Sequence, residues 1–216
     1  MAKPKVLVLN HGGLRSAVAT AMICAETSGA AARVRMLFID DGSPTSALRH
    51  KAASAQARHY HIADCGELAM RHLTPPASDD SESVPAKIET PLRQLQILTA
   101  ASGAALAAEA PRLVWPVQLG DEFEPAAKVI ESLVLLRHLI ETAHGARLQI
   151  DTPLLEMTDA QVVEVGHQMD VPWDRTWSCQ TDGETPCMAC LLCQRREVAF
   201  RKVGIEDPLT SPVTTA

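Results

Sequence analysis

Four cysteines near the C-terminus have the residue type and spacing to bind a metal ion. Cys179, Cys187, Cys190 and Cys193 form the pattern C-x7-C-x2-C-x2-C. Four thiolates at this spacing can close a tetrahedral shell around one ion, which is the usual form of a structural zinc site. A disulfide pair or a catalytic thiol is the alternative, but the closely spaced triplet favours a metal. The sequence therefore predicts zinc held by these four side chains.

A glycine-containing loop near the N-terminus has the composition of a phosphate-binding turn. It spans residues 10–16, reads NHGGLRS and follows a short apolar run directly. Glycines let backbone N–H groups approach an anion closely, and the positive end of the following helix points to the same place. A tight strand-to-helix turn would also use glycine, and the loop alone does not decide between the two. The candidate phosphate-binding residues are His11, Gly12, Gly13, Arg15 and Ser16.

Alternating strands and helices are expected to position these residues. Short apolar runs predict strands, and longer Ala-rich or amphipathic stretches predict the helices between them. The predicted strands are 5–10, 33–39, 60–63, 112–117 and 147–150, and the predicted helices are 14–27, 43–58, 92–109, 125–144 and 159–169. Thr158 is the expected N-cap of the last of these helices, and Thr45 or Ser46 of the second. This order predicts an α/β fold with a doubly wound, mostly parallel five-stranded sheet.

One segment between these elements has a different composition. Residues 74–91 carry four prolines, several serines and acidic residues, and little apolar content. Such a composition is typical of an exposed loop. A lid over a binding site is the alternative interpretation.

Composition limits the class of protein. The chain has 216 residues, a hydrophobic fraction of 46% and a net charge of −6, which fits one domain, or one with a small appendage. The negative net charge argues against direct, sequence-independent binding of nucleic acid. No apolar run is long enough to cross a membrane, and the N-terminus lacks the pattern of a signal peptide. We therefore expect a cytoplasmic protein, in which clustered thiols bind metal rather than form disulfides.

Several motifs taken together resemble the 7-cyano-7-deazaguanine synthase family, the QueC-like branch of the PP-loop pyrophosphatase superfamily. The most specific are TWSC at 176–179 and PCMACLLCQRRE at 186–197, and weaker ones are DDG at 40–42, TPLRQ at 90–94, TPLL at 152–155 and TDAQVV at 158–163. The similarity spans residues 6–209. It implies a PP-loop nucleotide-binding domain over 1–150, a helical zinc-binding region over 151–216, and a homodimer. It also implies that Asp40 and Arg93 are further nucleotide-site residues.

The resemblance implies a ligase that uses ATP with Mg²⁺ in the queuosine pathway. In such proteins the carboxylate of 7-carboxy-7-deazaguanine is activated as an adenylate, ammonia converts it to an amide, and a second activation yields the nitrile. The small-molecule partners expected from the resemblance are therefore a nucleotide and a deazapurine. The resemblance assigns no catalytic residue in this chain.

The phosphate loop departs from the family pattern, which is serine-glycine-glycine-x-aspartate-serine. His11 stands in place of the first serine and Arg15 in place of the aspartate. An arginine can pair with phosphate but cannot hold a metal ion. The stretch after Gly120 and residues 43–44 also lack the family motifs. Two hypotheses follow: an enzyme with altered or reduced activity, or a catalytically inactive paralogue that acts as a scaffold for a nucleotide-like ligand or a protein.

Overall fold

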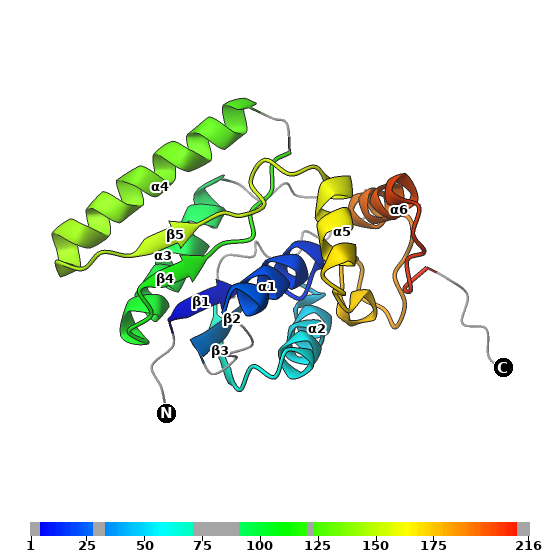
Figure 1. Ribbon diagram of the computed structural model, residues 1–216, viewed down its shortest axis with the longest axis horizontal. Coiled ribbons are helices and arrows are strands. Elements are labelled where there is room, and N and C mark those ends of the chain that lie inside the picture. The colour runs from blue at the N-terminus through cyan, green and yellow to red at the C-terminus, as the bar shows by residue number, and fades with distance from the viewer. Residues whose placement is uncertain (1–4, 28–32, 71–90, 121–122, 211–216) are drawn as a thin grey trace, which may run out of the picture.

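The computed structural model describes residues 5–27, 33–70, 91–120 and 123–210 (Figure 1). Its strands are β1 (Val6–Leu9), β2 (Val34–Asp40), β3 (Asp64–Ala69), β4 (Arg112–Val114) and β5 (Gln149–Asp151). They form one five-stranded sheet in the order β3-β2-β1-β4-β5, and every pairing is parallel. The predicted α/β fold and strand number are therefore confirmed.

Helices cover both faces of the sheet. They are α1 (Leu14–Glu26), α2 (Ser46–His59), α3 (Pro91–Ala107), α4 (Phe123–His144), α5 (Asp159–Gln168) and α6 (Leu191–Val203), with the short 3-10 helix η3 (Trp173–Arg175). Successive side chains of a strand point to opposite faces. Val6 and Val8 of β1 accordingly pack with α1, α2, α5 and α6. Leu7 and Leu9 pack with α3 and α4 on the other face.

The strand order reverses at β1, which creates the point where such sheets bind ligands. The chain leaves β1 toward β2 and β3 and then returns to the other side of β1 for β4 and β5. In open α/β sheets, ligands bind beyond the carboxyl ends of the strands at this reversal. Figure 1 shows α5 and α6 together on the side toward which the strands point. The cysteine-bearing segment and the loop after β1 are thus brought to one end of the sheet.

The predicted third strand, 60–63, is wrong. Helix α2 continues to His59, and His61 has a φ of 54° in the turn that follows. The strand begins only at Asp64, and its residues alternate between half-buried and exposed. Because β3 lies at the edge of the sheet, its sequence DCGELA carries no continuous apolar run that would have marked it.

Other boundaries differ less from the prediction. Strand β4 ends at Val114, earlier than expected. Thr158 caps α5 as predicted, and the Gln161 side chain completes a capping box. Thr45 occupies the N-cap position of α2 without a side-chain hydrogen bond to the helix. Most of the predicted loop 74–91, residues 74–90, lies outside the described residues.

The C-terminal region is packed on α1 by a close helix contact and is held together internally by a buried ion pair. A Cβ atom at Gly166 of α5 would lie 2.2 Å from Trp173 Cη2 and 2.8 Å from Val18 Cγ2, so only glycine fits there. Arg196 of α6 pairs with Asp207 through two hydrogen bonds of 2.5 and 2.7 Å. Among the described residues, no helix combines the length and apolar character that crossing a bilayer requires.

Candidate functional site

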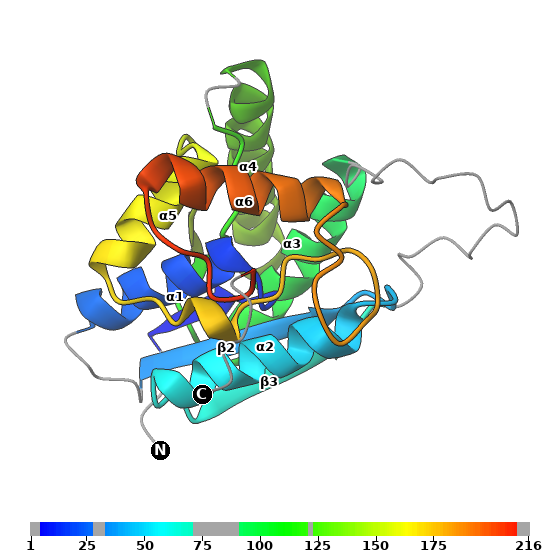
Figure 2. The ribbon, with the colours of Figure 1, turned by 90° about the vertical axis from the view of Figure 1, so that its right-hand side faces the viewer.

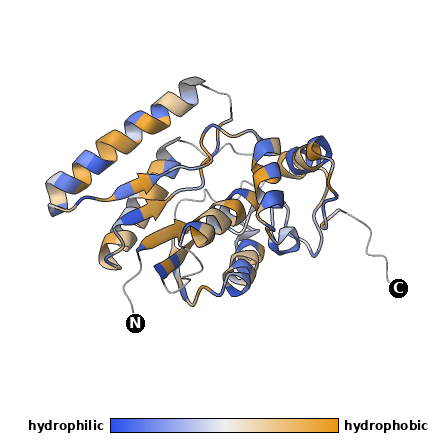
Figure 3. Ribbon diagram, viewed as in Figure 1, coloured by the Kyte–Doolittle hydropathy of each residue, from blue (hydrophilic) through white to orange (hydrophobic). Residues whose placement is uncertain are grey.

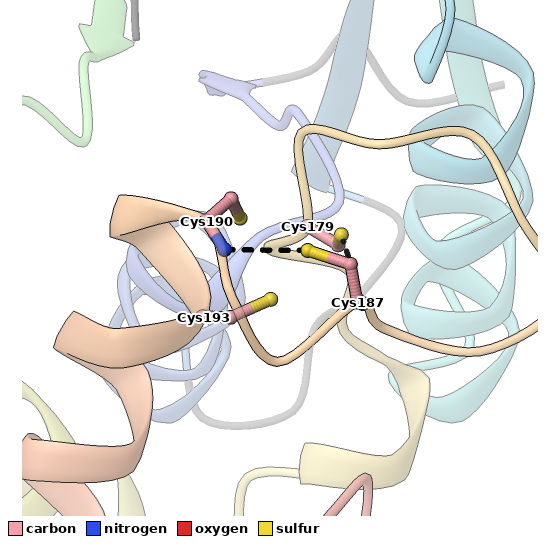
Figure 4. A group of neighbouring side chains, drawn as sticks. All are labelled: Cys179, Cys187, Cys190 and Cys193. Carbon is pink, nitrogen blue, oxygen red and sulfur yellow. Dashed lines mark hydrogen bonds between the residues drawn. The ribbon is translucent and has the colours of Figure 1, made fainter. Parts of the chain in front are cut away.

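The four predicted metal ligands come together at the start of α6. Their sulfur atoms all lie within 4.8 Å of one another. Figure 4 shows the side chains gathered between the first turn of α6 and the preceding loop. Sulfurs bonded tetrahedrally to one zinc ion at about 2.3 Å would lie about 3.8 Å apart. The cysteines of the described residues are all free thiols, so the disulfide alternative is not found among them and the cluster could hold a metal ion.

Hydrogen bonds to sulfur favour the thiolate form that a metal requires. Hydrogen bonds from the Thr181 side chain and from the backbone N–H groups of Ala189 and Cys190 lower the pKa of Cys187 to about 6. Burial raises the pKa of Cys193 above its usual value. A buried thiol beside a thiolate is a group that a cation can deprotonate on binding.

The two glycines of the phosphate loop have different structural roles. Gly12 has a φ of 78°, and a Cβ atom there would lie 2.1 Å from the carbonyl oxygen of Arg49. The tight-turn explanation is therefore sufficient for Gly12, because α2 fills that space. Gly13 is the N-cap of α1 and makes no side-chain cap bond. The N-terminus of α1 therefore presents backbone N–H groups at the loop, as an anion site requires.

The polar side chains of the loop hold its shape. The backbone N–H of His11 donates to Ser16 Oγ at 3.0 Å, and Ser16 Oγ lies 3.4 Å from His11 Nδ1. Asn10 Oδ1 accepts from the N–H of Gly12 at 2.7 Å. Ser16 is buried, whereas His11 and Arg15 are half-buried. The predicted loop residues thus lie together around the N-terminus of α1.

Contacts between distant parts of the chain join this loop to the segment that carries the cysteine cluster. The Gln56 amide nitrogen donates to the carbonyl oxygens of Gly12 and Arg175, at 3.1 and 2.8 Å. The backbone N–H of Trp177 donates to the carbonyl oxygen of Gly12 at 2.8 Å. Gln56 was not identified from the sequence, because a lone glutamine in a helix belongs to no recognisable motif.

Asp40 is the last residue of β2, and Arg93 of α3 reaches the residue that follows it. Both side chains are bonded to other groups of the protein. Asp40 Oδ1 accepts from Ser46 Oγ at 2.6 Å and from the Gly42 N–H at 3.0 Å. Arg93 Nη2 contacts Asp41 Oδ2 at 2.6 Å. The sequence interpretation did not single out Asp41 as a functional residue, although the DDG motif contains it.

Asp41 also binds a second arginine. Arg49 Nη2 lies 2.6 Å from Asp41 Oδ1. Burial by itself raises the pKa of Asp41. The positive charges of Arg49 and Arg93 and the hydrogen bonds from Ser43 lower it by more, so the pKa lies below its usual value of 3.8. The carboxylate is therefore ionised at neutral pH and holds residues from α2 and α3 together.

A cavity of about 570 Å³ lies between the segment after β4, the start of α5 and one face of α6. Its lining residues are Gln118, Leu119, Gly120, Thr158, Asp159, Ala160, Gln194, Arg195, Val198, Ala199 and Lys202. Arg195 spans its wall through two hydrogen bonds to Asp159, at 2.7 and 3.0 Å. No sequence motif indicated this cavity, since its lining comes from three separate elements.

Comparison with known proteins gives a match over nearly the whole chain. A family model described as "Queuosine biosynthesis protein QueC" matches residues 5–204. A 7-cyano-7-deazaguanine synthase of Methanoculleus marisnigri is 28% identical over 184 residues, which cover 78% of this chain and 82% of that protein. One of Trichodesmium erythraeum is 42% identical over 65 residues, which cover 30% of this chain and only 29% of that protein.

The fold also has a counterpart among solved structures. The U34-tRNA thiolase NcsA of Methanococcus maripaludis, solved with its 4Fe-4S cluster, matches with a TM-score of 0.52 and 15% identity. The match covers 91% of this chain and 63% of that one, which is less than two thirds of its length. At this identity the likeness concerns the fold alone.

Proposed function

The chain belongs to the QueC family, and on that premise we propose that it is a zinc-bearing, ATP-binding protein of ligase type with an altered or reduced reaction. The proposed substrate class is a deazapurine carboxylate, as for the relatives named 7-cyano-7-deazaguanine synthase. The observation that carries the proposal is Arg15 in the first turn of α1, beside the N-cap Gly13. A cation thus stands where the family pattern has an aspartate.

The charge at this position determines which part of the ATP chemistry the loop supports. Backbone N–H groups at the N-terminus of α1 and the guanidinium of Arg15 favour a phosphate group. Arg15 offers no oxygen ligand to Mg²⁺, which prefers carboxylates and phosphates. Bound ATP would supply the leaving group for activating a carboxylate. We propose that the loop binds its phosphates with little help from Mg²⁺.

Zinc is the metal we propose for the cysteine cluster. Sulfur atoms within 4.8 Å of one another suit one tetrahedral ion, whereas a 4Fe-4S cluster separates its four thiolates by a whole iron–sulfur cage. Four protein ligands leave no open position, so the role of the ion is structural. We also propose a cytoplasmic location, because a reducing compartment would keep the four thiols available to a metal.

The cavity beside β4 is the place we propose for the deazapurine. Part of its lining is the segment that follows β4, residues 118–120, and its volume of about 570 Å³ suits a small molecule. Lys202 gives its wall a cationic group that complements a carboxylate, whereas Arg195 is already paired with Asp159.

The second candidate function is that of an inactive paralogue that binds a nucleotide-like ligand or a protein partner. Two predicted ligand-binding side chains support it, because Asp40 is bonded to Gly42 and Ser46 and Arg93 to Asp41. Both hypotheses share the metal site and the phosphate loop. They differ in whether nucleotide binding leads to turnover.

Restoring the family loop separates the two functions. We propose measuring ATP consumption and nitrile formation with 7-carboxy-7-deazaguanine and ammonia for the parent and for His11→Ser/Arg15→Asp. An altered enzyme shows slow ATP consumption in the parent and a faster, Mg²⁺-dependent reaction in the double variant. Absence of turnover in both, with intact ATP binding, supports the scaffold. Absence of ATP binding in both contradicts the nucleotide-binding proposal itself.

We also propose that the protein forms a homodimer through α4. Ile130, Val134, Leu135 and Leu139 project from this helix and are between 48% and 64% exposed, and Figure 3 shows hydrophobic residues interspersed along it. A two-fold axis beside Val134 and Leu135 pairs apolar side chains at its centre. It also places Glu131 opposite His138 of the second copy, because Glu131 lies three residues before Val134 and His138 lies three residues after Leu135. Such self-complementarity is what a two-fold interface requires.

A further inference from the structure

Asp41 holds two arginines from different helices where β2 ends. Its Oδ1 accepts from Arg49 Nη2 and its Oδ2 from Arg93 Nη2, both at 2.6 Å. The carboxylate is 8% exposed, and the two arginine side chains are 19% and 18% exposed. The backbone N–H of Ser43 also donates to Oδ1 at 3.1 Å. Each oxygen of one fixed carboxylate is therefore bound by a different guanidinium.

A pair of guanidinium groups is the usual protein receptor for phosphate and carboxylate groups. This pair lies at the same end of the sheet as the phosphate loop. The backbone of Arg49 is packed on that loop, since its carbonyl oxygen lies 2.1 Å from where a Cβ atom of Gly12 would be. Figure 2 shows α2 and α3 on the two sides of β2. Asp41 thus occupies an anion-binding position, formed by Arg49 and Arg93, beside the proposed nucleotide site.

We propose that Asp41 determines specificity by taking the place of an anionic ligand group at Arg49 and Arg93. A polyphosphate bound at the loop cannot use these arginines unless it displaces a carboxylate that is anchored by the adjacent backbone. The site therefore favours ligands whose anionic groups are bound by the loop alone over ligands with a further anionic group that would need these two arginines. The identity of the ligand rests on the proposed nucleotide-binding function, whereas the competition depends only on these three side chains.

The direct test is calorimetric titration of inorganic triphosphate into the full-length protein without Mg²⁺. Asp41→Asn retains the size of the side chain but removes its charge, so binding is expected to tighten by about tenfold or more. Asp64→Asn is the matched control, because Asp64 pairs with Arg35 at 3.4 Å at the opposite, amino end of the strands. It should leave the affinity unchanged. Equal or weaker binding by Asp41→Asn overturns the proposal.

Two further variants keep the result interpretable. In Asp41→Asn/Arg93→Gln the gain should disappear, because the released guanidinium is gone. If Asp41→Asn folds poorly, Arg93→Gln alone tests the proposal. The triphosphate affinity of this variant should stay within about twofold of the parent's, because Asp41 already binds Arg93 in the parent. A tenfold loss of affinity overturns the proposal. If the parent protein binds ATP but the variants show none of these differences in triphosphate affinity, the proposed function stands and the role of Asp41 is contradicted. If the variants differ in triphosphate affinity but the parent does not bind ATP, the role of Asp41 stands and the proposed nucleotide binding is contradicted.

Discussion

The backbone N–H of Trp177 donates a 2.8 Å hydrogen bond to the carbonyl oxygen of Gly12. Trp177 lies two residues before the first metal ligand, Cys179, and Gly12 lies in the phosphate loop. Gln56 reinforces the link by donating to the carbonyl oxygens of both Gly12 and Arg175. The conformation of the loop is therefore tied to the segment that carries the proposed metal site.

Loss of the metal should consequently affect the loop as well as stability. Cys190→Ser removes one of four ligands, and structural zinc contributes about 10 kcal/mol or more to folding in small domains. We expect lost zinc, a markedly lower Tm and weaker ATP binding in any protein that remains folded. Elemental analysis, thermal melts and calorimetry measure the three effects.

Cys65→Ser is the matched control for this variant, since Cys65 is exposed on β3 outside the cluster. It should retain about one zinc per chain and the parent's Tm. Iron and sulfide in place of zinc in freshly prepared parent protein would contradict the proposed metal. A Cys190→Ser protein as stable as the parent would show that the ion has no structural role.

The buried pair between Arg196 and Asp207 should be a second determinant of stability. The two side chains are 4% and 2% exposed, and Arg196 Nη1 also donates to Thr176 Oγ1 at 2.6 Å. Asp207→Ala leaves a buried guanidinium without its counter-ion, which typically costs about 3–5 kcal/mol. Denaturant unfolding should show this loss. Asp174→Ala, at a 65% exposed side chain 3.8 Å from Arg175, should change the free energy of unfolding by less than about 1 kcal/mol.

The sequence was sufficient for the features that depend on local pattern. Apolar runs identified the central strands, and Thr158 identified the start of α5. The spacing of the cysteines predicted a cluster that the structure brings together. Strand β3 was misplaced because an edge strand needs no continuous apolar run. Asp41, Arg49 and Gln56 were missed because their roles arise from contacts across 8 to 119 residues of sequence, which no local pattern records.

The stability contributed by Asp41 should depend on pH in a defined direction. Its pKa in the folded protein is lowered from 3.8, so its stabilising effect is fully present above 3.8 and is lost as the pH falls through the folded value. The difference in unfolding free energy between the parent and Asp41→Asn should therefore be constant between about pH 5 and 7 and shrink in more acidic solution. A difference that grows on acidification would contradict the ion pairs.

The proposed dimer makes a prediction about one exposed side chain. Leu135→Glu places two carboxylates beside the two-fold axis and should shift the protein to monomer, because like charges at an apolar contact disfavour association. Sedimentation velocity over a range of concentrations measures the change. Lys51→Glu, on the exposed face of α2, should leave the oligomeric state as it is. A parent protein that is monomeric at every concentration would contradict the interface.

We propose above all that the loop around Arg15 binds the phosphates of a nucleotide without the aspartate of the family pattern. The most direct measurement is calorimetric titration of the parent with ATP, once with Mg²⁺ and once with EDTA at a concentration that leaves the cysteine-bound zinc in place. Binding should occur in both, with dissociation constants within about threefold of each other, because Arg15 provides the positive charge. No heat and no thermal shift in either condition would contradict the account.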